Sequence, residues 1–371
     1  MGNWGSLSNG YWGGAIILIE CWLPRAVLWA RDAIVIQQQK GRRMRPFEFI
    51  EPTTLEEVLG LLQDGARQAR LIAGGSDLLG ELKDDIVHYE RLVSLAGITA
   101  LQDLHQDETG LRLGALVTIV QLEHEPRLQG PYSILAEAAR GVATPEVRNQ
   151  GTLGGNLCQR PRCLYYRSAL SPCLKKGGAD CPAVTGPYQD YLSIMGGHGC
   201  FSVHASDLAP PLIALGGHVT MTGPAGERTL PLEQFFAGPE RDVQRENVLA
   251  DDEVLTAVTL PPPEPSWKGT YLKARERTAG DFPLVSAAVG YTRDTGAIQH
   301  ARVVLGGVAP IPWRSPQAEA ILTGQSPSPE LAAHAAEAAL ATAQPLRHNA
   351  FKLDIARALI ARAIMAVVTM P

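Results

Sequence analysis

From Met44 onward, short apolar strands alternate with amphipathic helices along the chain. The pattern predicts a strand over 47–50 and a second strand over 70–73. Between them it predicts a helix that begins after Thr54, with a capping box formed by Thr54 and Glu57. The apolar face of this helix is supplied by Leu55, Val58, Leu59 and Leu62. A strand followed by a glycine-containing turn and a helix is therefore the first unit that the pattern predicts.

Predicted strands and helices continue to the end of the chain. Strands are predicted over 111–116, 218–222, 228–232, 254–260, 270–275, 284–292 and 299–307. Helices are predicted over 77–82, 119–123, 134–140, 207–215, 330–343 and 350–368, and a long loop over 141–156. The proline-rich segment 261–265 reads as a linker, which divides the sequence into a first domain over 44–265 and a second over 266–371.

Composition narrows the class of protein. The 371 residues carry a formal net charge of −5, with 45% hydrophobic and 19% charged residues, as expected of a globular chain. No basic excess indicates a nucleic-acid partner, and no apolar run approaches the ~20 residues that a bilayer requires. Residues 1–43 lack the pattern that begins at Met44, so we expect an N-terminal extension with Met44 as the natural start. A genuine anchor or partner-binding helix is the alternative.

Two glycine-rich segments carry candidate chemistry. The first is 73–79 (AGGSDLL), directly after a predicted strand, where Ser76 or Asp77 is expected to cap the following helix. The second is 149–157 (NQGTLGGNL). Backbone N–H groups in such turns suit a phosphate or diphosphate, although the dinucleotide fingerprint G-x-G-x-x-G is absent. Two tight structural turns remain the alternative reading.

Five of the six cysteines lie within the single stretch 158–200: Cys158, Cys163, Cys173, Cys181 and Cys200. No pair has the C-x-x-C spacing of zinc ribbons or thioredoxin-type redox motifs. The segment is rich in proline and glycine, so it cannot bury a core and needs another constraint. Spacing alone favours a metal site, with iron–sulfur and zinc both open, over free thiols or disulfides.

Taken in order, several motifs resemble the FAD-binding subunit of the molybdenum hydroxylases, the xanthine dehydrogenase and carbon monoxide dehydrogenase family. They are AGGSDLL at 73–79, LGALVTI at 113–119, VRNQGTLGGNL at 147–157, HASDLAPPLIAL at 204–215, YLKARERTAGDFPLVSAAV at 271–289 and VVLGGVAPIPWR at 303–314. The resemblance runs from Met44 to the end. It implies an α+β fold, with a two-subdomain FAD-binding fold of the p-cresol methylhydroxylase and vanillyl-alcohol oxidase type. A C-terminal α/β flavoprotein domain with a three-stranded sheet and helices follows.

The resemblance also implies a set of FAD-binding residues. The first glycine loop would hold the diphosphate through Leu71, Ile72, Ala73, Gly74, Gly75, Ser76, Asp77 and Leu78. The second would do so through Thr152, Gly155 and Asn156. Asp207 matches an aspartate that contacts FAD, Lys273 matches a lysine near the flavin, and Leu255 matches a flavin-side leucine. No catalytic acid or base is expected on this chain.

Two branches of the family carry a cysteine insertion that holds a [4Fe-4S] cluster: 4-hydroxybenzoyl-CoA reductases and bacterial periplasmic aldehyde oxidoreductases. The insertion here resembles the second branch. The resemblance therefore implies Cys163, Cys173, Cys181 and Cys200 as cluster ligands within an insertion over about 158–200. Cys158 would be left over.

The function that this resemblance implies is electron transfer within a heterotrimer. Substrate would be oxidised on a large molybdopterin subunit, and electrons would pass through a small [2Fe-2S] subunit to FAD on this chain and then to an external acceptor. A 4-hydroxybenzoyl-CoA reductase type of subunit, a stand-alone flavin oxidoreductase and a zinc-stapled binding protein are the alternatives. We expect the cytoplasm as its compartment, or the periplasm if a partner's signal exports the folded complex.

Overall fold

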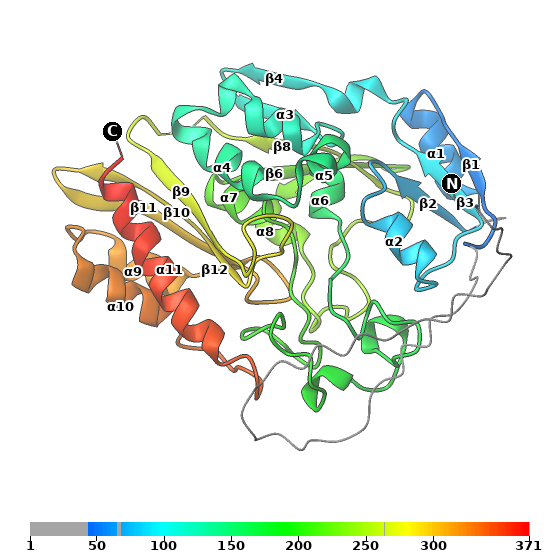
Figure 1. Cartoon of the computed structure of the whole chain (residues 1–371). Helices are drawn as coiled ribbons and strands as arrows, with labels where there is room; N and C mark the ends of the chain where they lie inside the picture. Colours follow the sequence, from blue (N-terminus) through cyan, green and yellow to red (C-terminus); the bar gives the residue numbers. More distant parts are fainter. Residues whose placement is uncertain (1–43, 65–67, 263, 371) are drawn as a thin grey trace, which may run out of the picture. The chain divides into compact units, whose positions relative to one another are not determined.

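Three sheets organise the part of the chain that the computed structural model describes, namely residues 44–64, 68–262 and 264–370 (Figure 1). The predicted extension over 1–43 lies outside these residues. Helices and strands occur in both halves, so the predicted mixed α+β class is confirmed.

The first sheet is parallel, with the strand order β1-β3-β2. Its strands are β1 (Glu48–Ile50), β2 (Ala69–Ile72) and β3 (Arg91–Ser94), accompanied by helices α1 (Leu55–Gln63) and α2 (Leu78–Lys83). The predicted capping box is present, because Thr54 accepts from Glu57 N–H and the Glu57 side chain accepts from Thr54 N–H. The pattern does not predict β3, because its four residues are all buried and show no alternation.

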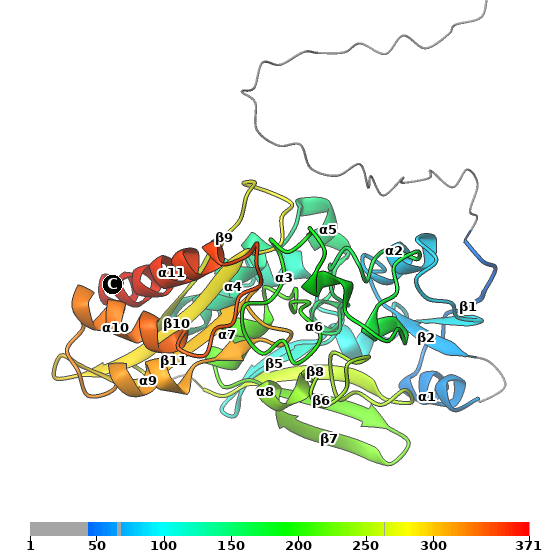
Figure 2. The ribbon, with the colours of Figure 1, turned by 90° about the horizontal axis from the view of Figure 1, so that it is seen from below.

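The second sheet is antiparallel, with the order β4-β5-β8-β6-β7 and β7 at its outer edge (Figure 2). Its strands are β4 (Leu104–Asp107), β5 (Gly110–Gly114), β6 (His218–Gly223), β7 (Gly226–Pro231) and β8 (Val254–Leu260). The helices of this part are α3 (Ile119–His124), α4 (Ser133–Gly141), α5 (Pro145–Gln150), α6 (Leu153–Leu157), α7 (Ala209–Ala214) and α8 (Leu232–Phe235). Inward residues such as Leu111, Leu113 and Val258 join one large core with α4 and α7.

The predicted loop over 141–156 is wrong, because α5 and α6 occupy most of it. Pro145 stands in the first turn of α5, where its missing N–H costs nothing. Thr152 caps α6 by accepting from Gly155 N–H at 3.1 Å. Both helices are too short for an apolar period to reveal them.

The third sheet has the order β12-β11-β10-β9, so the predicted three-stranded sheet is corrected to four strands. It contains β9 (Lys268–Ala274), β10 (Val285–Asp294), β11 (Ala297–Gly306) and β12 (Trp313–Arg314). The added strand has two residues, which pair with Val304 and Leu305. A strand of this length leaves no alternation to detect.

Both faces of the third sheet are covered. Helices α9 (Pro316–Leu322), α10 (Pro329–Ala339) and α11 (Phe351–Val368) pack on one face, and α4 and α7 pack on the other (Figure 1). Alternate residues serve the two sides: Ala287 and Val289 lie in the core with α11, whereas Ala288 lies in the core with α4. The C-terminal domain is thereby packed directly on α4 and α7 of the first domain.

The cysteine insertion contains neither α-helix nor strand between Cys158 and Cys200, only two 3-10 turns at Leu174–Lys176 and Pro182–Val184. The C-terminal helix α11 forms a hydrogen bond with the C-terminal part of this insertion. The fully buried Lys352 donates to the carbonyl oxygens of Leu192 at 2.8 Å and Gly307 at 2.6 Å. Among the described residues no helix is both long enough and apolar enough to span a bilayer.

Candidate functional site

The two glycine-rich segments touch each other. A Cβ placed on Gly74 would stand 1.8 Å from the carbonyl oxygen of Gln150, so only glycine allows this contact. Gly75 has a φ of +70°, a conformation that glycine adopts without strain. The turn after β2 therefore lies directly against the turn that joins α5 to α6.

The second segment is held by backbone hydrogen bonds to the residues that follow β5. Ile119 N–H donates to the Gly151 carbonyl at 2.9 Å, and Leu153 N–H donates to the Val117 carbonyl at 2.8 Å. These bonds fix the start of α6 beside the first sheet. The motif over 113–119 thus positions the second glycine segment.

A cavity of about 510 Å³ opens where these segments meet. Twelve of the fourteen predicted cofactor residues line it: Leu71, Ile72, Ala73, Gly74, Gly75, Ser76, Asp77, Leu78, Thr152, Gly155, Asn156 and Asp207. Its size and mixed lining are those of a small-molecule site. Leu255 does not line it, because β8 places this residue in the core, where it is 5% exposed.

Lys273 also stands outside the lining, directly behind Asp207. Its ammonium donates to Asp207 Oδ2 at 2.7 Å and to the Gly141 carbonyl at 2.9 Å, while Tyr271 donates its hydroxyl to Asp207 Oδ1 at 2.5 Å. Burial raises the pKa of Asp207 even though Lys273 and Tyr271 lower it. Strand β9 of the C-terminal domain therefore orients an acidic residue that faces the cavity.

Three arginines of the cysteine insertion line the same cavity: Arg160, Arg162 and Arg167. The motifs do not single them out. The signal that could have found them is the density of arginine between Cys158 and Cys173, in the run QRPRCLYYR over 159–167. Phe282 also lines the cavity, and the Arg162 guanidinium carbon lies 5.1 Å from the centroid of its ring. The insertion therefore forms part of the wall of the cavity.

Asp77 is the residue that these arginines contact. It stands at the N-cap position of α2, as predicted, but its side chain makes no capping bond to that helix. Instead its carboxylate accepts from Arg160 N–H at 2.7 Å, from Arg167 at 2.6 Å and from the Arg162 guanidinium. Burial raises the pKa of Asp77, but Arg162 and Arg167 outweigh it and hold that pKa below its usual value.

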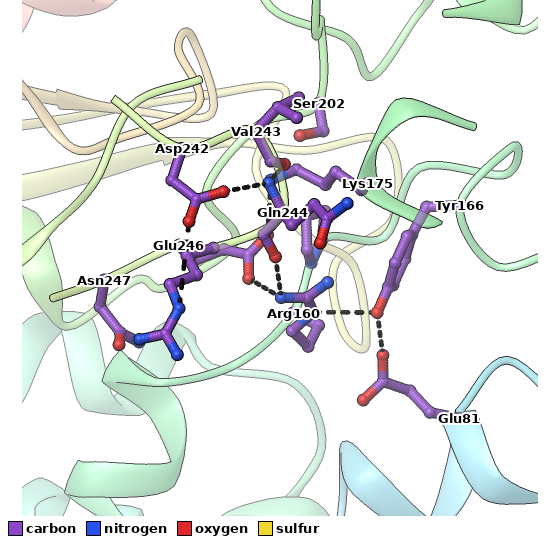
Figure 3. Close-up of polar contacts among 12 residues, drawn as sticks. Glu81, Arg160, Tyr166, Lys175, Ser202, Asp242, Val243, Gln244, Glu246 and Asn247 are labelled. Atoms are coloured by element: carbon purple, nitrogen blue, oxygen red, sulfur yellow. Dashed lines mark hydrogen bonds and ion pairs between the residues drawn. The ribbon is translucent and has the colours of Figure 1, made fainter. Parts of the chain in front are cut away.

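Arg160 connects three parts of the chain (Figure 3). Its guanidinium donates to the Tyr166 hydroxyl at 2.9 Å and pairs with Glu246, which Lys175 also contacts at 2.7 Å. Tyr166 in turn donates to Glu81 of α2 at 2.5 Å. Burial raises the pKa of Glu81. A buried polar network thus fixes the insertion to α2 and to the segment before β8.

The cysteines of the insertion are free thiols with hydrogen-bond donors around them. Burial raises the pKa of Cys163 to about 11, while the N–H groups of Tyr166 and Tyr165 lower it. The Cys173 sulfur accepts hydrogen bonds from the backbone N–H groups of Lys175 and Lys176, and the Cys181 sulfur accepts them from those of Phe201 and Ala183. These bonds lower the pKa of both thiols, against the effect of burial. The Cys200 sulfur lies 3.4 Å from the Ser202 hydroxyl.

These four thiols also act on one another, whereas Cys158 stands apart. Cys173 and Cys181 raise the pKa of Cys163, and Cys200 raises that of Cys173 and of Cys181. Burial raises the pKa of Cys158 to about 12, opposed only by Arg70. Within the described residues, no three or more His, Cys, Asp or Glu are grouped so that they could hold a metal ion.

Comparison with known families divides the chain in two. Residues 45–263 match the family described as the FAD binding domain in molybdopterin dehydrogenase, and residues 270–367 match the CO dehydrogenase flavoprotein C-terminal domain. Together these matches span all three sheets.

Individual relatives agree with this division. The aldehyde oxidoreductase FAD-binding subunit PaoB of Escherichia coli K12 is 34% identical over 79% of this chain and 89% of its own length. The carbon monoxide dehydrogenase medium chain of Hydrogenophaga pseudoflava is 28% identical over 86% and 96%. A solved carbon monoxide dehydrogenase from that organism, which lacks the Mo-pyranopterin moiety, superposes with a TM-score of 0.71 at 27% identity and covers 88% and 98%. The chain belongs to the family of FAD-binding subunits of molybdenum hydroxylases.

Proposed function

We propose that this chain is the FAD-binding electron-transfer subunit of a multi-subunit molybdenum hydroxylase of the aldehyde or xanthine dehydrogenase type. One observation carries the proposal: the two glycine segments and Asp207, far apart in sequence, line a single cavity. That cavity lies in the domain that matches the FAD-binding family. FAD accepts electrons and passes them to an external acceptor, and the protein supplies binding, orientation and electrostatics.

In this proposal different predicted residues contact different parts of FAD. The turn around Gly74 and Gly75 would offer backbone N–H groups to the diphosphate, and Thr152, Gly155 and Asn156 would contact it from the second segment, because all of them line the cavity. Asp207, which Lys273 and Tyr271 orient, would contact the flavin part of the cofactor. Leu255 contributes to the core beneath the site.

We further propose that Cys163, Cys173, Cys181 and Cys200 hold a [4Fe-4S] cluster. Cys163, Cys173 and Cys181 each receive two backbone N–H groups, and Cys200 has a hydroxyl beside it. Such donors stabilise the sulfur of a cysteine thiolate that ligates a cluster. The thiols interact with one another but are not gathered as ligands of a single ion would be. A cluster contains its own sulfides, so its cysteines stand further apart.

The cluster proposal is tested with Cys163→Ser and with Cys158→Ser as the matched control. We expect Cys163→Ser to lose iron and the broad absorbance at about 400 nm, and Cys158→Ser to keep both. Unchanged iron in Cys163→Ser, or zinc in its place in the wild-type protein, would contradict the assignment.

The partners implied are a small [2Fe-2S] subunit and a large molybdopterin subunit. Relatives named as medium chains or FAD-binding subunits support such an assembly. The test is purification of the chain from its native host, followed by identification of the bound proteins and assay of molybdenum, iron and flavin. We expect all three components. A chain that purifies alone with flavin and oxidises a substrate by itself would favour a stand-alone flavin oxidoreductase.

A further inference from the structure

The turn that faces the diphosphate in our proposal carries an acidic residue, Asp77. Its pKa lies below the usual value, so the carboxylate is negative at neutral pH. A negative charge in this position repels a diphosphate, unless neighbouring cations outweigh it. The described residues around Asp77 supply such cations from the cysteine insertion.

Two guanidinium groups, those of Arg162 and Arg167, share a single oxygen, Oδ1, of Asp77. A single carboxylate therefore balances only one of two positive charges, and both arginines line the cavity. Arg167 also reaches back into the insertion, where its N–H donates to the Cys163 carbonyl at 2.9 Å. The excess positive charge is thus held at the cavity wall by the chain on both sides of Cys163.

The surrounding network does not absorb that excess. Arg160 and Lys175 are both paired with Glu246, so two cations share one carboxylate there as well (Figure 3). Glu81 lies 4.0 Å from Arg167, and burial raises the pKa of its carboxyl. Four cations in this network thus face three carboxyls, one of which is held towards its neutral form. The other charged residues of the cavity wall balance: Arg70 and Asp84 carry opposite charges, Asp281 is paired with Arg277, and Asp207 is paired with Lys273.

We infer that Arg162 and Arg167 of the cysteine insertion bind the diphosphate of FAD, and that Asp77 serves to position them. The inference rests on the proposed binding of FAD at this cavity. Arginine suits the role because its planar fork matches phosphate oxygens and stays charged. It follows that the insertion completes the flavin site, besides carrying the proposed cluster.

The test measures the affinity of the full chain, stripped of flavin, for FAD and for ADP by fluorescence titration. We expect Arg162→Gln and Arg167→Gln each to weaken FAD about tenfold or more, and to weaken ADP by a similar factor because ADP carries the same diphosphate. Arg357→Gln on α11, which removes an exposed arginine paired with Glu337, is the control and leaves both affinities unchanged. Iron content and circular dichroism report whether the insertion stays folded.

A second arm separates charge from folding. In the Arg162→Gln/Arg167→Gln background, Asp77→Asn removes the carboxylate that no longer has a counter-charge, so we expect FAD affinity to rise again. Arg162→Lys, which keeps the charge, should retain more affinity than Arg162→Gln. Unchanged FAD affinity in the glutamine variants, a loss for FAD but not for ADP, or no recovery with Asp77→Asn would overturn the inference. A wild-type chain that binds no FAD would instead refute the proposed function.

Discussion

Lys273 of β9 donates to Asp207 at 2.7 Å, and both side chains are more than nine-tenths buried. The pair joins the C-terminal sheet to the segment that faces the cavity. Removing one partner of a buried ion pair leaves an uncompensated charge, which costs about 3–5 kcal/mol of unfolding free energy. The packing of the two domains and the shape of the flavin site are therefore linked through these two residues.

Lys273→Met is expected to lower the unfolding free energy by about 3 kcal/mol or more, because Asp207 stays buried without its cation. Thermal unfolding of the variant and of Lys83→Met, an exposed lysine on α2, measures the effect. Adding Asp207→Asn should restore part of the loss by removing the orphaned charge. A loss in Lys273→Met no larger than in Lys83→Met would contradict this account.

Gly74→Ala should disrupt the contact between the two glycine segments. The added Cβ would meet the Gln150 carbonyl at 1.8 Å, and backbone on both sides cannot move away cheaply. We expect loss of bound FAD together with lower stability, measured as flavin content and melting temperature. Gly60→Ala in α1 is the matched control, because its Cβ meets nothing within 4 Å. That change should stabilise the helix by about 0.5–1 kcal/mol, and equal flavin content in the two variants would refute the prediction.

His204 predicts a pH dependence of stability. Burial lowers the pKa of this histidine from 6.5 to about 4, and its ring packs edge-on against Phe236. The unfolded chain therefore binds a proton that the folded chain does not, so stability is lost as pH falls below 6.5. Each pH unit corresponds to about 1.4 kcal/mol, or about 2 kcal/mol between pH 6.5 and 5.

Comparison of wild type with His204→Gln isolates this contribution. The difference in unfolding free energy between the two proteins should shrink by about 2 kcal/mol from pH 6.5 to 5. His334→Gln, an exposed residue of α10, should keep the wild-type dependence. Parallel curves for wild type and His204→Gln would show that this histidine does not carry the effect.

Ser202 is expected to tune the proposed cluster. Its hydroxyl lies 3.4 Å from the Cys200 sulfur, and Ser202 is buried. A thiolate ligand can only accept, so the hydroxyl donates, and hydrogen bonds to sulfur favour the more negative, reduced cluster. Ser202→Ala should therefore lower the reduction potential in a redox titration followed by electron paramagnetic resonance, with iron content unchanged. A potential equal to that of wild type would contradict the role.

Local patterns predicted most elements of this fold. Strand β8 has the predicted bounds of 254–260, and the capping box at Thr54 is where the sequence places it. The glycine segments were also predictable, since each follows from residue types within a few positions. The elements β12, α5 and α6 were not predicted, because with two, six and five residues they are too short for a hydrophobic period to repeat clearly.

The electrostatics of the site could not be predicted in the same way. Asp77 before a helix carries the signal of a cap, yet its carboxylate binds Arg162, 85 residues away. Pairings across that distance depend on how the insertion folds over α2. Likewise, the resemblance points to Lys273 and Asp207 separately, but only the packing of β9 brings them together.

The central claim is that FAD and a cysteine-bound cluster are held by this one chain. The most direct measurement is the flavin and iron content of the anaerobically purified full chain, with Cys163→Ser measured alongside. We predict FAD and iron in a ratio of about one to four in the wild type, with iron lost in the variant. A wild-type chain that contains no FAD, or contains FAD with no iron, would contradict the account.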